Sequence, residues 1–276
     1  MSGLILAGAC RQDAVDPRDL DFSDLRDRLL VGQEEIKAGV ASDGQVELPE
    51  RTPISDQGRR PSCVANAGCD ALELIMPHPV VQLSRLFAYK NSRLLHGEGA
   101  SDNGTYGRTM FQSFSKIGCA PEALWPYDER PESEGGVVNQ RPLLAVYEAA
   151  YDHKIEGYYA IKAAMSMRAD EVEAALRLQH PTFITMQVGQ AFADFDGTGD
   201  VVWNAPSRPI GRHAMVVVGV RWDSRGRRHF KLRNSWTRGW GEGGYAWATE
   251  AWICDPFTSD LWVPTMVPSF VVEPLA

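Results

Sequence analysis

The chain has 276 residues and a net charge of −8; 44% of its residues are hydrophobic and 23% are charged. These values are typical of a globular protein with one large domain or two lobes, long enough to bury a substantial core without disulfide bonds. The negative charge argues against binding to nucleic acids or anionic membranes. No apolar run reaches the roughly 18 residues that a membrane-spanning helix needs.

Residues 1–50 differ from the rest of the chain, because they hold eleven acidic and only five basic side chains. After an irregular start, apolar residues at helical spacing predict a short helix within residues 21–37. The turn-rich stretch 39–53 joins this segment to the body of the chain. We therefore expect residues 1–50 to form an acidic N-terminal segment that is distinct from the lobes.

Residues 51–140 are expected to form a mainly helical lobe. Apolar residues recur at helical spacing in residues 63–75, 83–95 and 108–117, which predicts a helix in each stretch. Small residues in the first of these suit a central helix that other elements approach closely. Residues 128–139 are rich in Pro, Glu and Gly and predict a loop at the boundary between two lobes.

Residues 141–276 are expected to form a mainly β lobe. A helix is predicted at residues 170–178, and short apolar runs at hairpin spacing predict strands at 181–188, 214–220, 229–233 and 244–248. Helices first and strands afterwards predict an α+β protein with segregated lobes.

Four residues carry the chemistry that the sequence indicates. Cys63 begins the first predicted helix of the helical lobe, where the positive end of the helix dipole favours a thiolate. Gln57, six residues earlier, can place an N–H donor where an oxyanion would form after attack on a carbonyl. Far downstream, His213 starts a buried strand and Asn234 lies before a glycine-rich stretch. This is a nucleophile, a base and an orienting amide, in chain order.

The chain has five cysteines, with neither a Cys-x-x-Cys pair nor the spacing of a metal site. An odd number without a disulfide framework indicates a reducing compartment. The apolar stretch before Cys10 is too short for an export signal and lacks the basic residues of one. We expect a cytoplasmic protein without metal or other cofactor, in which the cysteines other than Cys63 are buried, reduced apolar residues.

These motifs resemble those of the papain-like cysteine peptidases, especially their compact bacterial members. The matching segments are the Gln57 to Cys63 spacing, the glycine-flanked His213 strand, and Asn234-Ser-Trp236 with the glycine-rich stretch after it. The resemblance implies a helical lobe bearing Cys63, a β-barrel-like lobe bearing His213 and Asn234, and a peptide-binding cleft between them.

The resemblance also implies a mechanism. Cys63 attacks a carbonyl as a thiolate that protonated His213 stabilises, and a thioester acyl-enzyme forms. Asn234 orients the imidazole, and Trp236 shields that hydrogen bond from water. Gln57 and the backbone N–H of Cys63 hold the oxyanion.

Substrate contacts are predicted in the same way. Gly104 corresponds to a glycine that lines the substrate cleft of the family, or it is an ordinary loop glycine; Trp236 is also predicted to contact substrate. Val64 stands where many members have a tryptophan, so that wall of the cleft is smaller. Arg212 precedes His213 where plant members have an aspartate, and a cation there disfavours the protonated imidazole.

Several functions are compatible with these residues. The first is a cysteine endopeptidase that hydrolyses peptide bonds in a peptide or protein substrate. The same site also serves an acyl or peptidyl transferase or an amidase, because the nucleophile and oxyanion donors are shared. A catalytically silent peptide-binding module is the third, although the intact set of Gln57, Cys63, His213 and Asn234 argues against it.

The acidic segment 1–50 has two interpretations in a protein of this family. It is either a short inhibitory prosegment that occupies the cleft or a permanent arm packed on the lobes. Its length is below that of most family prosegments and it lacks their helical pattern, which favours the arm.

Overall fold

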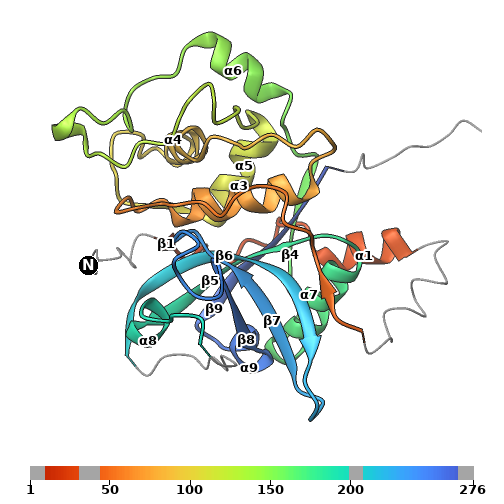
Figure 1. Ribbon diagram of the computed structural model, residues 1–276. Coiled ribbons are helices and arrows are strands. Elements are labelled where there is room, and N and C mark those ends of the chain that lie inside the picture. Colours follow the sequence, from red (N-terminus) through yellow and green to blue (C-terminus); the bar gives the residue numbers. More distant parts are fainter. Residues whose placement is uncertain (1–9, 31–43, 199–207, 267–276) are drawn as a thin grey trace, which may run out of the picture.

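A computed structural model describes residues 10–30, 44–198 and 208–266, which form two lobes (Figure 1). One lobe is mainly helical, and the other is built on an antiparallel sheet. The α+β architecture with segregated lobes is therefore confirmed. Among the described residues, no helix is both long and apolar enough to cross a membrane.

The helical lobe is built from α3 (Cys63–Ile75), α4 (Arg85–Leu95), α5 (Gly107–Lys116) and α6 (Leu144–Tyr151). The first three match the predicted helices to within two residues. α4 begins two residues later than predicted because Ser84 caps it, accepting a hydrogen bond from the backbone N–H of Phe87. α6 has no counterpart among the predicted helices.

Helix α3 lies at the centre of this lobe and is buried along almost its whole length. Its small residues allow the neighbouring helices to approach. At Gly68, a Cβ atom would lie 2.9 Å from Cγ of Met110 in α5 and 3.2 Å from the ring of Phe114. Any side chain at this position would push α5 away, so the close contact of the two helices depends on glycine.

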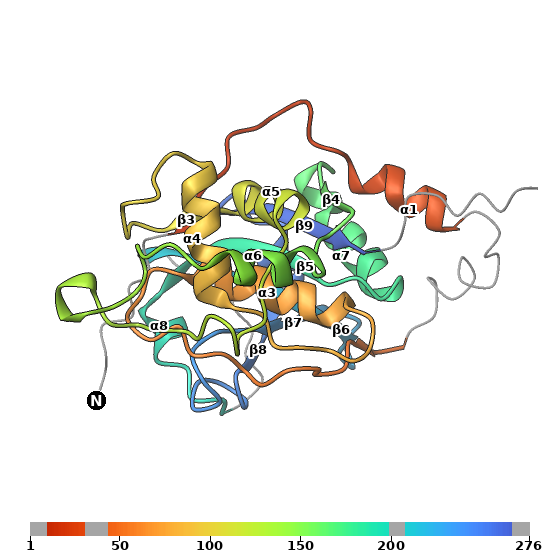
Figure 2. The ribbon, with the colours of Figure 1, turned by 90° about the horizontal axis from the view of Figure 1, so that it is seen from above.

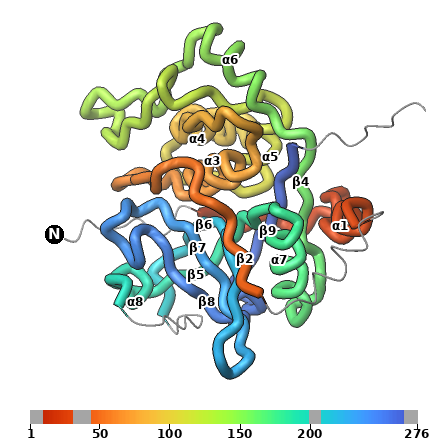
Figure 3. The backbone as a smooth tube through the Cα atoms, turned by 45° about the vertical axis from the view of Figure 1, so that its right-hand side comes forward, coloured from red at the N-terminus to blue at the C-terminus, as the bar shows by residue number. Residues whose placement is uncertain are grey.

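The sheet of the second lobe has the strand order β4-β9-β5-β6-β7-β8. Its strands are β4 (Gly157–Ala160), β5 (Thr182–Gly189), β6 (Pro209–Trp222), β7 (Arg228–Arg233), β8 (Tyr245–Thr249) and β9 (Thr258–Thr265). The short strand β2 (Val46–Glu47) pairs with the C-terminal part of β6, at Gly219 and Val220 (Figure 3). Among the described residues β4 and β8 do not pair, so the lobe expected to be β-barrel-like is an open sheet without a closed barrel.

Strand β9 was absent from the sequence-based prediction, yet it lies inside the sheet between β4 and β5. Its sequence begins with Thr-Ser-Asp and contains Pro264, which has no N–H group and disfavours an interior strand. Pro264 is accommodated near the end of the strand, opposite Tyr158 of β4. Its carbonyl accepts a hydrogen bond from His180 (3.2 Å).

Three further helices pack against the sheet. α7 (Arg168–Arg177) packs against β6, and α8 (Gln190–Ala193) and α9 (Glu250–Ile253) follow β5 and β8 in the chain. Single 3₁₀ turns lie at Glu132–Glu134 and Met165–Met167.

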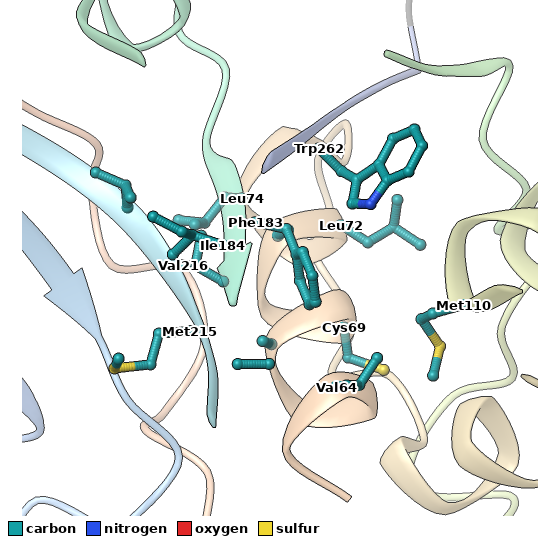
Figure 4. Packing of buried hydrophobic residues seen from close by; sticks show 14 of the residues in the cluster. Val64, Cys69, Leu72, Leu74, Met110, Phe183, Ile184, Met215, Val216 and Trp262 are labelled. Carbon is teal, nitrogen blue, oxygen red and sulfur yellow. The ribbon is translucent and has the colours of Figure 1, made fainter. Parts of the chain in front are cut away.

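The hydrophobic core continues from one lobe into the other (Figure 4). Phe183 of β5 and Trp262 of β9 pack against the side of α3 that carries Leu72. Each such side chain contributes about 1.5–3 kcal/mol when fully buried. The two lobes are thus held together through α3, the helix that begins with Cys63.

A buried ion network also joins the lobes. Asp70, two turns after Cys63 on α3, forms ion pairs with Arg85 (2.8 Å) and with Arg233 (3.3 Å) at the end of β7. Arg233 directly precedes Asn234 in the sequence. Because both charges are almost fully buried, removing one partner would leave an uncompensated charge, which costs about 3–5 kcal/mol. The network therefore fixes the distance between the helix of Cys63 and the strand end of Asn234.

The N-terminal segment crosses both lobes. β1 (Cys10–Arg11) pairs in parallel with β3 (Thr105–Tyr106), just before α5, and it also contacts β6. From there the chain runs along the outside of the molecule to α1 (Phe22–Leu30), which packs against α7 and β4 (Figure 2). The part of the predicted helix 21–37 beyond Leu30 lies outside the described residues.

Candidate active site

Cys63 is the first residue of α3 and is 1% exposed. The pKa of its thiol lies well below the ordinary value. The largest cause is a hydrogen bond from Cys10; the hydrogen bond and charge of His213 and the backbone N–H of Ala214 act in the same direction, against burial. A thiolate at Cys63 is therefore favoured, as nucleophilic chemistry requires.

His213 and Asn234 come from neighbouring strands, since His213 lies in β6 and Asn234 follows β7. The Nε2 atom of His213 lies 2.7 Å from Oδ1 of Asn234. The same oxygen accepts a hydrogen bond from the backbone N–H of Ser235 (2.8 Å). Because Oδ1 accepts both bonds, Nε2 must carry the proton. This leaves Nδ1 of His213 as the nitrogen that is available to Cys63, whose pKa His213 lowers.

Trp236 covers the His213 ring. The two ring centroids are 4.5 Å apart and the planes are tilted by 31°. Phe192 and Trp240 pack around Trp236, with centroids 5.6 Å from its ring. This aromatic cover keeps water from the bond between His213 and Asn234, which strengthens the bond. A substrate contact of Trp236 remains a prediction.

Gln57 is 1% exposed and its side-chain amide is held at both ends. Its Oε1 accepts a hydrogen bond from Ser235 Oγ (2.7 Å), and its Nε2 donates to the carbonyl of Arg60 (3.2 Å). The backbone N–H of Gln57 donates to the Ser235 carbonyl (3.0 Å). The amide nitrogen therefore faces the turn that leads into Cys63, and Ser235 links Gln57 to the residue that orients His213.

Gly104 and Val64 occupy different surroundings. Gly104 has a φ of 82°, which favours glycine, and it directly precedes β3. Its N–H donates to the hydroxyl of Tyr89 (2.9 Å). Val64 is 1% exposed and belongs to the buried cluster (Figure 4). Substrate contacts of both residues remain predictions.

Arg212 points toward the N-terminal segment. Its guanidinium donates to Ser259 Oγ (2.7 Å) and to Oε1 of Gln12 (3.0 Å). Successive side chains of a strand project to opposite faces. Arg212 and its neighbour His213 therefore lie on different faces of β6.

Residues 10–13 contact β3, β6, α5 and β9 and are called the N-terminal strap below. Cys10 is 5% exposed, and it and Cys63 shift the pKa of each other's thiol. Gln12 is held by Arg212 of the β lobe. Cys63 and His213 are each only 1% exposed beneath this segment. Both predicted catalytic side chains are thus covered in this structure.

Asp13 fastens the strap to both lobes. Its carboxylate accepts hydrogen bonds from the backbone N–H of Arg108 in α5 (2.8 Å) and from Nε1 of Trp262 in β9 (3.1 Å). Its own N–H donates to Oδ1 of Asp260 (3.1 Å). Burial and the nearby charge of Asp260 raise the pKa of Asp13 to about 6.

Three residues of this site were missed by the sequence-based prediction: Cys10, Asp13 and Ser235. Ser235 stands beside a predicted catalytic residue, and its hydroxyl is the signal that could have identified it. Cys10 and Asp13 carry no local signal, because contacts with residues far along the chain position them.

Residues 45–255 match the family model described as papain family cysteine protease. This match covers more than half of the chain, so the chain belongs to the papain family. It is accordingly a cysteine protease and a hydrolase. The fold and the chemistry expected from the sequence are confirmed at this level.

Individual relatives agree with this assignment. An uncharacterized peptidase C1-like protein of Acanthamoeba polyphaga mimivirus is 29% identical over 79% of this chain and 71% of its own length. Papain of Carica papaya is 24% identical over 75% of this chain, which spans 56% of the papain sequence. The crystal structure of xylellain, a cysteine protease from Xylella fastidiosa, superposes with a TM-score of 0.79 at 27% identity. That superposition covers 97% of this chain and 99% of xylellain.

Proposed function

We propose that this chain is a cysteine endopeptidase that hydrolyses peptide bonds in peptide or protein substrates, with Cys63 as its nucleophile. The observations that carry the proposal are the hydrogen bond between His213 and Asn234 (2.7 Å) and the lowering of the Cys63 pKa by His213. Because Asn234 Oδ1 also binds the Ser235 N–H, the orientation of both the amide and the imidazole is fixed. Nδ1 of His213 is thereby the atom that exchanges a proton with Cys63 and the substrate.

Acylation follows from this arrangement. The Cys63 sulfur attacks the carbonyl carbon, the new C–S bond forms, and the carbonyl oxygen becomes an oxyanion. The Cys63 N–H, at the start of α3, and an N–H of the Gln57 amide are the donors placed to stabilise it. His213 then gives its Nδ1 proton to the leaving amine, the C–N bond breaks, and a thioester remains.

Deacylation uses the same groups in reverse. His213, now neutral at Nδ1, takes a proton from a water molecule as the oxygen attacks the thioester carbon. Gln57 and the Cys63 N–H again stabilise the oxyanion, and Cys63 leaves as a thiolate. Asn234 keeps Nε2 protonated throughout, so His213 alternates only at Nδ1.

We also propose that the N-terminal strap has to leave the site before substrate binds. Residues 10–13 contact both lobes, Cys10 belongs to the same buried cluster as Cys63, and Cys63 and His213 are each 1% exposed. A peptide reaches the nucleophile only where these residues lie now. The strap is short and its strand β1 has two residues, so its local opening is less costly than unfolding.

Thiol labelling tests the nucleophile. The intact chain is treated with a peptidyl vinyl sulfone at neutral pH in reducing buffer, and the mass of the product is measured. One label is expected, and it should disappear in Cys63→Ala but persist in Cys69→Ala, which removes another buried cysteine of α3. The proposal is contradicted if the folded wild type takes up no label even after its strap has been removed by proteolysis.

Product analysis separates hydrolysis from acyl transfer. A peptide library is digested with and without an added amine acceptor, and the new termini are identified by mass spectrometry. Free carboxyl termini inside the peptides are expected as the main product. Amine adducts that dominate at low acceptor concentration would indicate a transferase, and ammonia released from side-chain amides would indicate an amidase.

For location, we propose the cytoplasm. The support is Arg60, which stands where secreted relatives carry a disulfide cysteine according to the resemblance and is here buried against Asp102 (2.5 Å). Fractionation of cells that express the tagged chain tests this, and recovery in the secreted fraction would contradict it.

A further inference from the structure

Two thiols meet in the active site, and only one of them is needed for catalysis. Cys63 is the proposed nucleophile, while Cys10 belongs to the strap and comes from the far end of the chain. Cys10 is 5% exposed and Cys63 is 1% exposed, both belong to one buried cluster, and each thiol shifts the pKa of the other. Packing alone would need only an apolar residue at position 10.

The position of Cys10 is fixed from both sides. In the parallel pairing of β1 with β3, Cys10 lies opposite Thr105. Two residues later, Gln12 is bound by Arg212, the neighbour of His213 in β6. Asp13 is then bound to α5 and β9. Contacts to both lobes therefore fix the position of Cys10 within the buried cluster that also contains Cys63.

The two thiols are also chemically complementary. Burial raises the pKa of the Cys10 thiol, with the nearby Cys63 and Asp260 charges adding to the effect, whereas the pKa of Cys63 is lowered. A thiolate is the form that reacts with peroxides. Cys63 is thus the sulfur that would be oxidised first, and Cys10 is a neutral thiol in reach of it.

We propose that Cys10 and Cys63 form a reversible disulfide when the protein meets a hydroperoxide, and that this bond locks the strap over the active site. Its effect on activity rests on the proposed role of Cys63 as nucleophile; its formation does not. The bond makes Cys10 an oxidation-linked modification site.

The chemistry balances in two steps. The Cys63 thiolate attacks one oxygen of hydrogen peroxide, the S–O bond forms and the O–O bond breaks, and hydroxide leaves and takes up a proton to give water. Cys63 is then a sulfenic acid. The Cys10 sulfur attacks the Cys63 sulfur, the S–S bond forms, and the S–O bond breaks. The proton of Cys10 leaves with that hydroxide as a second water, so two sulfurs lose two electrons in total to one peroxide.

Access and reversal are both consistent with the structure. Peroxide reaches Cys63 during local opening of the strap, and return of the strap brings Cys10 to the sulfenic acid. A dithiol reverses the bond by thiol–disulfide exchange. Without Cys10, the sulfenic acid can be oxidised further to sulfinic acid, which thiols do not reduce. The strap thus protects the nucleophile while it blocks the cleft.

The full-length, reduced chain is exposed to a small molar excess of hydrogen peroxide, alkylated under denaturing conditions without reductant, and analysed as intact protein and as peptides. We expect loss of two hydrogens, a peptide linking Cys10 to Cys63, and loss of peptide hydrolysis in proportion to the linked fraction. Dithiothreitol should restore both the free thiols and the activity.

Cys10→Ser is the test variant, with Cys10→Ala as a second in case serine disturbs the strap. Both should lack the linked peptide, accumulate oxygen atoms on Cys63, and lose activity that dithiothreitol does not restore. Cys119→Ser is the matched control, because Cys119 and Cys69 form another buried pair with sulfurs 3.9 Å apart. This control should behave like the wild type.

Two results would overturn the proposal. One is a Cys63 that is oxidised irreversibly to the same extent in the wild type and in Cys10→Ser. The other is a peroxide-induced disulfide that maps to Cys69 and Cys119 with none at Cys10. If the linked peptide forms but the reduced protein hydrolyses no substrate, the proposed function fails and the disulfide stands. If the reduced protein hydrolyses substrate but peroxide yields no linked peptide, the disulfide fails and the proposed function stands.

Discussion

Helix α3 carries two buried cysteines six residues apart, Cys63 and Cys69, and they are opposite in character. Cys63 is 1% exposed and Cys69 is fully buried. The pKa of Cys69 is raised by burial and by its interaction with Cys119, as expected for a thiol in apolar surroundings. The pKa of Cys63 is lowered although it is equally buried. Burial therefore does not decide the reactivity of a cysteine here.

The difference lies in the donors that surround each sulfur. Cys63 stands at the first turn of α3, where the helix dipole and free N–H groups favour negative charge, and it faces Cys10, His213 and the Ala214 N–H. Cys69 lies farther along the helix, and its sulfur neighbour is Cys119 at 3.9 Å. The same residue type on the same helix is thus reactive or inert according to what a few long-range contacts bring to it.

Replacing each cysteine in turn gives the largest contrast. Cys63→Ala should lower kcat/KM by about 10⁴-fold or more, because no other group supplies the nucleophile. Cys69→Ala should leave kcat/KM close to that of the wild type and lower the free energy of unfolding by about 1–2 kcal/mol through the lost packing. Peptide hydrolysis and denaturant unfolding of both variants measure this. An inactive but folded Cys69→Ala protein would remove the distinction between the two sites.

Gln57→Ala separates the oxyanion donor from the reactivity of the thiol. Loss of one such donor typically costs about 10²–10³ in kcat. The rate of Cys63 alkylation, which has no oxyanion, should change little in a protein from which the strap has been removed. Stopped assays of hydrolysis and of iodoacetamide labelling supply the two rates.

Ser235→Ala is the matched control for Gln57. It removes the hydroxyl that holds Gln57 Oε1 (2.7 Å) but leaves the donor in place. Its loss of kcat should therefore be smaller, on the order of tenfold, as expected when one neutral hydrogen bond is lost. Equal losses of hydrolysis and of labelling in Gln57→Ala would mean that Gln57 acts on the thiol and not on the oxyanion.

The reactive end of α3 could be predicted from the sequence because its signals are local. The small residues of α3, the apolar run around His213 and the glycines after Asn234 mark a helix start, a buried strand and a tight turn. Their spacing along the chain matches the motif spacing of the papain family. The hydrogen bonds between them follow once these elements pack, and the structure brings Cys63, His213 and Asn234 together.

The covered state of the site could not be predicted in this way. The strap depends on a two-residue strand and on polar contacts across about 90 to 250 positions of sequence, and such contacts leave no periodic pattern. The place of β9 was missed for a related reason, since its polar start and Pro264 hide a strand that tertiary pairing stabilises. Local propensity does not identify a strand that only long-range pairing stabilises.

Asp13→Asn tests the cover through its pH dependence. The pKa of Asp13 is about 6 with the strap in place against an ordinary value of 3.8. Protonation therefore favours docking: this contribution is fully present below about pH 4 and is lost as the pH rises through 6. At neutral pH, Asp13→Asn removes the buried charge and keeps an acceptor for the Arg108 N–H.

Alkylation of Cys63 reports on the strap, because the strap must open for the reagent to enter. Asp13→Asn should slow alkylation by roughly tenfold at pH 7, because the docked strap becomes more stable when it no longer buries a charged carboxylate. This tenfold effect is part of the stabilisation that the raised pKa of Asp13 implies. The ratio of wild-type to variant rates should approach one below about pH 4, and taking the ratio cancels the titration of the thiol itself. A ratio that is independent of pH would show that Asp13 does not titrate on docking.

Arg212 should give the smallest effect, and it tests whether the charge next to His213 acts on the imidazole or on the strap. The sequence suggests the first, since a neighbouring cation disfavours the protonated ring. In the structure the guanidinium is turned to Ser259 and Gln12, on the other face of β6 from His213. We therefore expect Arg212→Gln to speed Cys63 alkylation a few-fold by releasing Gln12, and to move the acid limb of the pH–rate profile by only a few tenths of a unit.

Arg225→Gln, which neutralises an exposed arginine in the turn after β6, is the control for net charge and should change neither the alkylation rate nor the acid limb. The contrary result is an acid limb that moves by a full unit in Arg212→Asp while the rate of Cys63 alkylation is unchanged. The charge of Arg212 would then act on His213, and Arg212 would not be needed to hold the strap.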